Sequence, residues 1–195
     1  MRLPQTSNAR LALVSLIALT ALGLAACGGK SFDSGSGSGS SSPPPVNNNQ
    51  AIEVNLGPLS DYPNGLFTTV TICVPGTSDC QNIPDVLVDT GSEGLRLLSS
   101  AVTLQLPTIA DSNNNNLQEC VVFGDGSFNW GGVVSADIKL AGEIGSSVPM
   151  QLIDSSSPTM FPVPSACTSG GGSNANTVQA LGANGILGVG NFQQD

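Results

Sequence analysis

The sequence contains no histidine, and this absence removes several kinds of active site. Without an imidazole the chain cannot build a Ser-His-Asp triad, a Cys-His pair or a zinc site with histidine ligands. Aromatic residues make up only 4% of the chain, and this poor supply of stacking surfaces disfavours a carboxylate-based glycosidase. Any acid-base chemistry near neutral or acidic pH therefore falls to the side chains of aspartate and glutamate.

Basic residues are also scarce. Five Lys and Arg stand against fourteen Asp and Glu, a formal net charge of −9 at pH 7. Such a chain repels the phosphate backbone, so nucleic acid is not an expected partner. It also repels anionic lipid head groups, so membrane attachment would have to come from acyl chains and not from a basic patch.

The first 26 residues have the layout of a secretory signal peptide. Arg2 and Arg10 lead into an apolar run at residues 11–24, which is shorter than the roughly 20 residues that span a bilayer. The ending Leu-Ala-Ala-Cys-Gly at residues 24–28 resembles the lipobox of bacterial lipoproteins. We therefore predict cleavage before Cys27, lipidation of Cys27 and anchoring in the cell envelope. Gly28, rather than an aspartate, follows the cysteine, and the resemblance to bacterial lipoproteins then implies the outer membrane. The alternative is a signal peptide cut elsewhere, with Cys27 an ordinary cysteine.

The composition divides the rest of the chain into a linker and a domain. Residues 31–50 are nearly all Ser, Gly, Pro and Asn, which cannot bury a core, so residues 27–50 are predicted to be a lipidated cysteine followed by a disordered tether. Residues 51–195 are enough for one compact domain.

Short apolar runs rich in Val, Ile, Leu and Thr, interrupted by Gly, Pro and Asn, indicate that this domain is mainly β. Helix signals are weak. Residues 111–116 and 169–176 are predicted to be loops or insertions that place nothing in the core. The candidate strands are residues 52–56, 66–74, 86–89, 95–98, 118–123, 131–140 and 150–153.

Four cysteines remain besides the lipidated one, and an exported chain favours two disulfides. Of the three possible pairings we favour Cys73 with Cys80, because the six residues between them include a proline and a glycine and can form a tight turn between strands. Cys120 with Cys167 then follows by elimination. The alternative is a thiolate metal site or a catalytic cysteine, but no C-x-x-C pair accompanies them. No metal or cofactor is predicted.

One aspartate has a distinctive setting. Three apolar residues at positions 86–88 run directly into Asp89-Thr90-Gly91-Ser92. Asp89 would then stand at the end of a buried strand, with its carboxylate held by neighbouring amides and by the hydroxyl of Ser92 or Thr90. This arrangement suits a catalytic acid, and the alternative is an aspartate that caps an ordinary turn.

Two segments further along the chain give this motif a context. Phe123-Gly124-Asp125-Gly126-Ser127, followed by residues 131–140, is similar to the flap hairpin of pepsins and the strand after it. Ile186-Leu187-Gly188 is similar to the hydrophobic-hydrophobic-Gly segment that braces the catalytic loop in the same family. In this order, over most of residues 52–190, the chain resembles the N-terminal lobe of a pepsin-like aspartic peptidase. The pattern also resembles an uncharacterised family of bacterial lipoproteins with a pepsin-like look.

This resemblance implies a single pepsin-like lobe, half of a bilobal fold, with Asp89 as one member of a catalytic dyad. The chain departs from pepsins at Phe123, where they have the flap tyrosine, and at residues 93–97, where they usually have Ser, a spacer and an aromatic residue. In the second segment Arg96 is expected to alter the local charge. The expected substrate is a peptide or an unfolded protein, with water as nucleophile. The alternative function is a non-catalytic peptide-binding or structural lipoprotein of the envelope on the same fold.

An aspartic peptidase needs two carboxylates that share one proton. The sequence contains a single Asp-Thr-Gly and no second Asp-Ser/Thr-Gly. We therefore expect a second lobe, encoded beyond residue 195, to supply the other aspartate, or a homodimer partner to do so. The 195-residue chain is expected to be inactive by itself.

Overall fold

The computed structural model describes residues 48–154 and 162–191. The predictions for the signal peptide, Cys27 and nearly all of the tether lie outside the described residues. Within the two described ranges no helix is long and apolar enough to cross a membrane.

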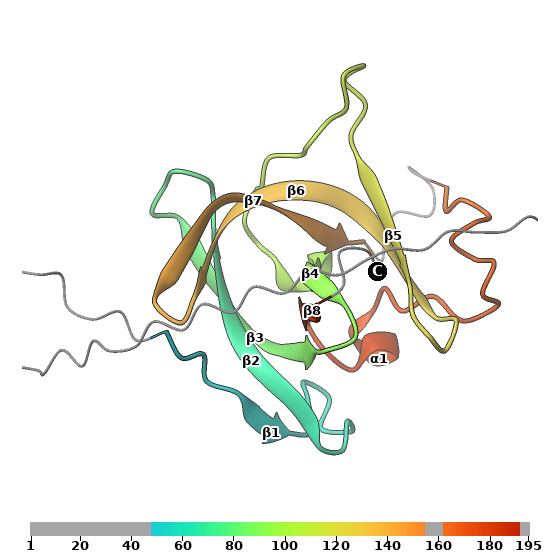
Figure 1. Ribbon diagram of the computed structural model, residues 1–195, viewed down its shortest axis with the longest axis horizontal. Helices are drawn as coiled ribbons and strands as arrows, with labels where there is room; N and C mark the ends of the chain where they lie inside the picture. The colour runs from blue at the N-terminus through green and yellow to red at the C-terminus, as the bar shows by residue number, and fades with distance from the viewer. Residues whose placement is uncertain (1–47, 155–161, 192–195) are drawn as a thin grey trace, which may run out of the picture. The chain divides into compact units, whose positions relative to one another are not determined.

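The described part of the chain is mainly β, as the sequence predicts (Figure 1). One short 3-10 helix, Ser99–Ala101, and one four-residue helix, α1 (Val178–Leu181), accompany the strands. The strands are β1 (Glu53–Asn55), β2 (Gly65–Cys73), β3 (Cys80–Asp89), β4 (Glu93–Leu98), β5 (Gln118–Val122), β6 (Phe128–Leu140), β7 (Glu143–Ile153) and β8 (Gly185–Val189).

Six of these strands close into a barrel. The sheet order is β1-β2-β3-β8-β4-β7-β6-β5, and an additional pairing between β2 and β6 joins the two sides of the sheet. Strands β3 and β8 are parallel, as are β4 and β7, while the other neighbours are antiparallel. Closure satisfies the strand edges, and only β1 and β5 extend from the barrel as outer strands.

The barrel interior is filled by aliphatic side chains that alternate along the strands, as expected for strands with one buried face. A smaller cluster of Phe128, Trp130 and Cys167 joins the start of β6 to the segment that precedes α1. The main cluster consists of Val70, Ile72, Ile83, Val86, Leu95, Leu97, Val134, Ala136, Ile138 and Met150.

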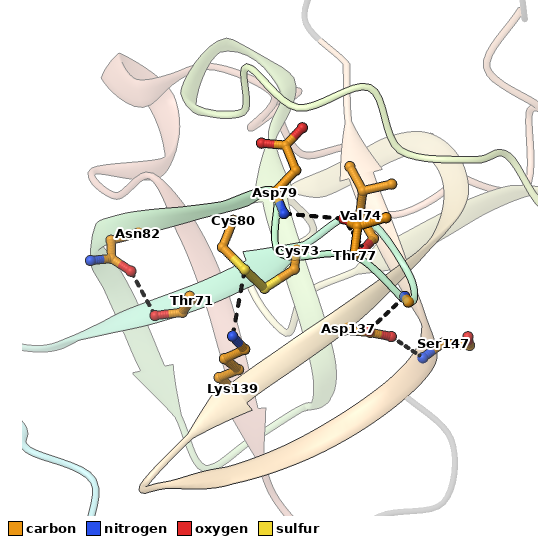
Figure 2. The surroundings of a disulfide bond; sticks show 11 residues. Thr71, Cys73, Val74, Thr77, Asp79, Cys80, Asn82, Asp137, Lys139 and Ser147 are labelled. Carbon is orange, nitrogen blue, oxygen red and sulfur yellow. Dashed lines mark hydrogen bonds between the residues drawn. A yellow bond between two sulfur atoms is a disulfide. The ribbon is translucent and has the colours of Figure 1, made fainter.

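Both predicted disulfides are confirmed. Cys73 and Cys80 are bonded across the turn between β2 and β3, which Figure 2 shows. Cys120 of β5 is bonded to Cys167, at a sequence separation of 47. Because these four sulfurs are in disulfides, the alternative of a thiolate metal site or a catalytic cysteine is wrong for them.

The predicted strands lie in the right places, but several begin too late. The structure starts β3 at Cys80 and not at residue 86, and β7 at Glu143 and not at residue 150; β4 and β6 also begin earlier than predicted. The first five residues of β7 are all exposed, so no apolar alternation marks them in the sequence. Residues 185–189, which were absent from the predicted strands, form β8.

The prediction for residues 169–176 is wrong in one respect. These residues are loop, but Ala175 and Asn176 are buried. The side chain of Asn176 accepts a hydrogen bond from Trp130 N at 3.0 Å and donates to Trp130 O at 2.9 Å. It therefore pairs with the β6 backbone as a neighbouring strand would, which composition alone does not reveal. Residues 111–116 form the predicted loop.

Candidate functional site

Asp89 is the last residue of β3, and both of its carboxylate oxygens accept hydrogen bonds from the following turn. Gly91 N donates to Oδ1 at 2.9 Å, and Ser92 Oγ donates to Oδ2 at 2.7 Å. Ser92 is buried whereas Thr90 is exposed, so Ser92 supplies the hydroxyl. These two bonds fix the orientation of the carboxylate.

Strand β8 lies between the two strands that the Asp89 turn connects. It is parallel to β3, with Gly188 opposite Asp89, and antiparallel to β4, with Gly188 opposite Gly94. A Cβ added at Gly188 would lie 2.6 Å from backbone atoms of Glu93. Only glycine therefore lets β8 pass this close to the start of β4, and the Ile186-Leu187-Gly188 segment lies directly beside the turn.

Residues 123–127 form the hairpin between β5 and β6. Phe123 N donates to Ser127 O and Gly126 N donates to Phe123 O, each at 2.8 Å. The Asp125 carboxylate accepts from Ser127 Oγ at 2.6 Å and from Ser127 N at 2.9 Å. The hydrogen bond from the Ser127 hydroxyl, and to a smaller extent that from the Ser127 amide, hold the pKa of Asp125 below its usual range. Asp125 is therefore an anion even in mildly acidic solution.

The tip of this hairpin contacts the glycine-rich segment at residues 170–172. Gly126 has a φ of +83°, and a Cβ at Gly172 would lie 2.0 Å from the carbonyl carbon of Gly126. Two backbones thus meet without side chains between them. The disulfide between Cys120 and Cys167 ties the base of the hairpin to the same segment.

The Asp89 turn and the hairpin line one cleft of about 410 Å³. The structure therefore brings together the predicted catalytic residue and most of the predicted flap. Gly126 does not line the cleft, and of the predicted bracing residues only Ile186 does. The other lining residues are Phe123, Gly124, Asp125 and Ser127 from the hairpin, with Tyr62, Leu87, Ala175, Ala180 and Leu181.

Tyr62 is a cleft residue that sequence reasoning missed. It lies in the connection between β1 and β2, where its ring meets Phe67 edge-on at a centroid distance of 5.7 Å. A Cβ at Gly182, the residue that ends α1, would lie 2.4 Å from the Tyr62 ring. It is the one tyrosine of the sequence, and that scarcity is the signal that could have directed attention to it. Ala175, Ala180 and Leu181 carry no such signal.

Arg96 does not line the Asp89 cleft. It is buried, its Nη1 donates to Glu93 O at 2.5 Å, and its Nη2 lies 3.5 Å from Glu119 Oε1. The guanidinium therefore links β4 to β5 outside the Asp89 cleft.

Within residues 48–154 and 162–191, no three side chains of the His, Cys, Asp or Glu type gather in a way that could hold a metal ion. The cleft offers two carboxylates, one phenol and an apolar wall. Such a set can orient a water molecule and exchange a proton with it, and it has room for an apolar side chain beside Asp89.

Comparison with known protein families places this chain in one of them. No curated protein matches the sequence. Residues 44–195 match the family described as "Protein of unknown function (DUF3443)", a match that covers most of the chain and the whole of the described part. The chain therefore belongs to the DUF3443 family.

Proposed function

We propose that this chain is one lobe of an aspartic endopeptidase that is held in the cell envelope by a lipid on Cys27. The observation that carries the proposal is the geometry of Asp89, whose two oxygens are oriented by Gly91 and Ser92 on the wall of a cleft that a hairpin shares. The resemblance of these segments to the pepsin N-terminal lobe supports the same reading.

The proposed reaction is the hydrolysis of a peptide bond by a carboxylate dyad. Two nearby carboxyl groups share one proton because both cannot be ionised together. The ionised member takes a proton from a bound water, whose oxygen attacks the peptide carbonyl carbon, while the other member gives its proton to the carbonyl oxygen. When the C–N bond of the resulting tetrahedral diol breaks, a proton passes to the leaving amine and the dyad is restored.

The proposal requires a second carboxylate from elsewhere. Of the described residues, Asp125 is the other acid on the cleft wall, but its Oδ1 accepts two hydrogen bonds from Ser127. It is therefore committed to the hairpin turn. We propose that a second lobe brings the other aspartate to Asp89, with a homodimer as the less favoured source.

A peptide or unfolded protein is the proposed substrate. Leu87, Leu181 and Ile186 give the cleft an apolar wall beside Asp89, which suits a hydrophobic side chain next to the scissile bond. The hairpin at residues 123–127 would cover the bound segment and exclude water.

The test is cleavage of a denatured protein by the full chain, measured from pH 3 to pH 7, with and without the proposed second lobe supplied in trans. Cleavage should be acidic in its pH dependence and should vanish in Asp89→Asn. Asp79→Asn is the matched control, because Asp79 is exposed in the β2–β3 turn outside the cleft. A mass measurement in solution then assigns the second carboxylate to a dimer or to another lobe.

The second candidate is a peptide-binding or structural lipoprotein without catalysis. It is favoured by the single Asp-Thr-Gly of the sequence. Peptide binding that is equal in the wild-type chain and in Asp89→Asn, with no cleavage at any pH even with a second lobe present, would select it.

A further inference from the structure

A larger hollow, of about 590 Å³, is lined by residues of β4, β5, β6 and β7. Residues 119–121 of β5 line this hollow, whereas Phe123 and the hairpin line the Asp89 cleft. Glu93 and Gly94, which directly follow the Asp89 turn, belong to the same wall. The two hollows are thus lined by adjacent parts of the chain, at β5 with its hairpin and at the Asp89 turn with the start of β4.

The floor of this second hollow combines apolar residues with two neighbouring polar side chains. Arg96 of β4 and Gln151 of β7 are register partners in the parallel pair, and their chain neighbours Leu95, Leu97 and Met150 fill the barrel core. Successive side chains of a strand point to opposite faces. The side chains of Arg96 and Gln151 therefore lie outside the barrel core, where both contact Glu119 of β5.

Gln151 carries an unsatisfied acceptor in this floor. Its side chain is 1% exposed, and Nε2 donates to Glu119 O at 2.8 Å, which fixes which end of the amide is the oxygen. The other end, Oε1, is buried and has no hydrogen-bond partner among the described residues. A buried acceptor without a donor is unfavourable, so a ligand that brings an N–H group would improve this site.

The charges in the walls select the sign of that ligand. Glu93 and Glu119 supply two negative charges against the single positive charge of Arg96. The guanidinium already contacts Glu119 and the carbonyl oxygen of Glu93. An anion would meet an excess of like charge, whereas an ammonium or guanidinium group would be attracted by the net negative charge and could donate to the amide acceptor.

We propose that this hollow is a subsite for the lysine or arginine side chain of a bound peptide. The inference rests on the proposed function, since it assumes a peptide that also reaches Asp89. Strand β5 is the last in the sheet order, so an extended peptide can lie along its outer edge. Because residues 119–121 line the hollow and Phe123 lines the cleft, such a peptide would reach both. Glu93, Glu119 and Gln151 are then specificity-determining residues and not catalytic ones.

The experiment measures peptide binding by calorimetry, with the full chain carrying Asp89→Asn so that nothing is cleaved. The peptides are uncharged eight-residue sequences in which one position after another is lysine, norleucine or glutamate. At one position the lysine peptide should bind about tenfold more tightly than the norleucine peptide, as a partly buried charge pair allows. This preference should weaken as salt is added.

Three variants locate the preference. Glu93→Gln and Glu119→Gln should each lower the lysine-to-norleucine ratio severalfold, and Gln151→Met should lower it while keeping the volume of the side chain. Asp79→Asn removes the same charge far from the hollow and should leave the ratio unchanged. Circular dichroism confirms that each variant is folded, and the Glu93 variant keeps the test valid if the loss of Glu119 disturbs Arg96.

Equal binding of lysine and norleucine peptides at every position overturns the inference, and so does tighter binding of the glutamate peptide, which would make Arg96 the recognising group. Cleavage by the wild-type chain with the second lobe present decides the proposed function separately. Cleavage without a lysine preference overturns the subsite alone. A chain that neither cleaves nor binds any of the peptides overturns both.

Discussion

Two aspartates, at two sites on the barrel, hold their carboxylates in different ways. Asp89 accepts hydrogen bonds from residues two and three positions further along its own turn. Asp137 accepts from Gly76 N at 2.8 Å, across 61 residues of sequence, and from Ser147 N at 2.7 Å (Figure 2). In Figure 1 the β2–β3 turn that contains Gly76 lies at the left, and β5 and α1, near the Asp89 cleft, lie at the right.

The difference distinguishes a carboxylate that joins distant segments of the fold from one that is oriented by its own turn. Asp137 joins the β2–β3 turn and β7 to β6 at a place that lines none of the clefts described above. The amide of Gly76, then that of Ser147, and then the charge of Lys139 hold the pKa of Asp137 below its usual range. The two hydrogen bonds of Asp89 stay within its own turn. The strands on either side of that turn, β3 and β4, are connected by β8.

The largest expected effect is on catalysis. Asp89→Asn should reduce peptide cleavage by about 10³-fold or more, since it removes one member of the proton-sharing pair, while the midpoint of urea unfolding stays nearly unchanged. Asp137→Asn should do the opposite and leave the activity per folded molecule intact. Initial rates with the second lobe present, and unfolding curves of both variants, check this. Loss of stability in Asp89→Asn comparable to that in Asp137→Asn would remove the distinction.

The disulfides of the same two regions should differ in their contribution to stability. Cys120 and Cys167 close a sequence separation of 47, and Cys73 and Cys80 one of 7. Loop-closure entropy then gives about 4 kcal/mol for the first and about 2.5 kcal/mol for the second. Paired Cys→Ser variants, compared by urea unfolding, measure both values. A larger loss at the Cys73–Cys80 turn would show that native contacts there outweigh chain entropy.

Close backbone packing beside Asp89 predicts the next effect. Gly188→Ala places a Cβ 2.6 Å from the backbone of Glu93, and strained packing of this kind costs about 1–3 kcal/mol of the free energy of unfolding. Gly124→Ala is the matched control in the hairpin, because a Cβ there meets nothing within 4 Å. If both variants unfold at the same denaturant concentration, β8 does not brace the Asp89 turn as tightly as the structure indicates.

The sequence was sufficient to predict those parts of the fold that depend on local pattern. The apolar runs ending at Asp89 and around residues 66–74 mark strands with one buried face, and the proline and glycine between Cys73 and Cys80 mark their turn. It was not sufficient to predict hydrogen bonds between residues that are distant in the sequence. Asp137 accepts hydrogen bonds from the backbone amides of Gly76 and Ser147. No sequence pattern marks these amides as its partners.

The candidate site shows the same limit. Asp89 and the hairpin were predictable from their motifs, but Tyr62 reaches the cleft only because Gly182 makes room for its ring. Asn176 takes part in the fold through hydrogen bonds to the backbone of Trp130, and nothing in a Gly, Ser and Asn-rich stretch distinguishes it from its neighbours. Contacts of this kind join segments that are distant in sequence and meet only in the folded barrel, so the sequence alone does not reveal them.

The smallest effect is the pH dependence of Asp137. Its folded pKa lies below the ordinary value of 3.8, so its stabilisation is fully present above that value and is lost as the pH falls through the lower folded pKa. The difference in urea midpoint between wild type and Asp137→Asn should therefore be constant from pH 7 to about pH 5 and shrink below about pH 4. Asp79→Asn, in the β2–β3 turn, is the control for the general loss of one negative charge. A difference that persists undiminished at pH 2 would mean that the shape of the side chain, and not its negative charge, holds the amides of Gly76 and Ser147.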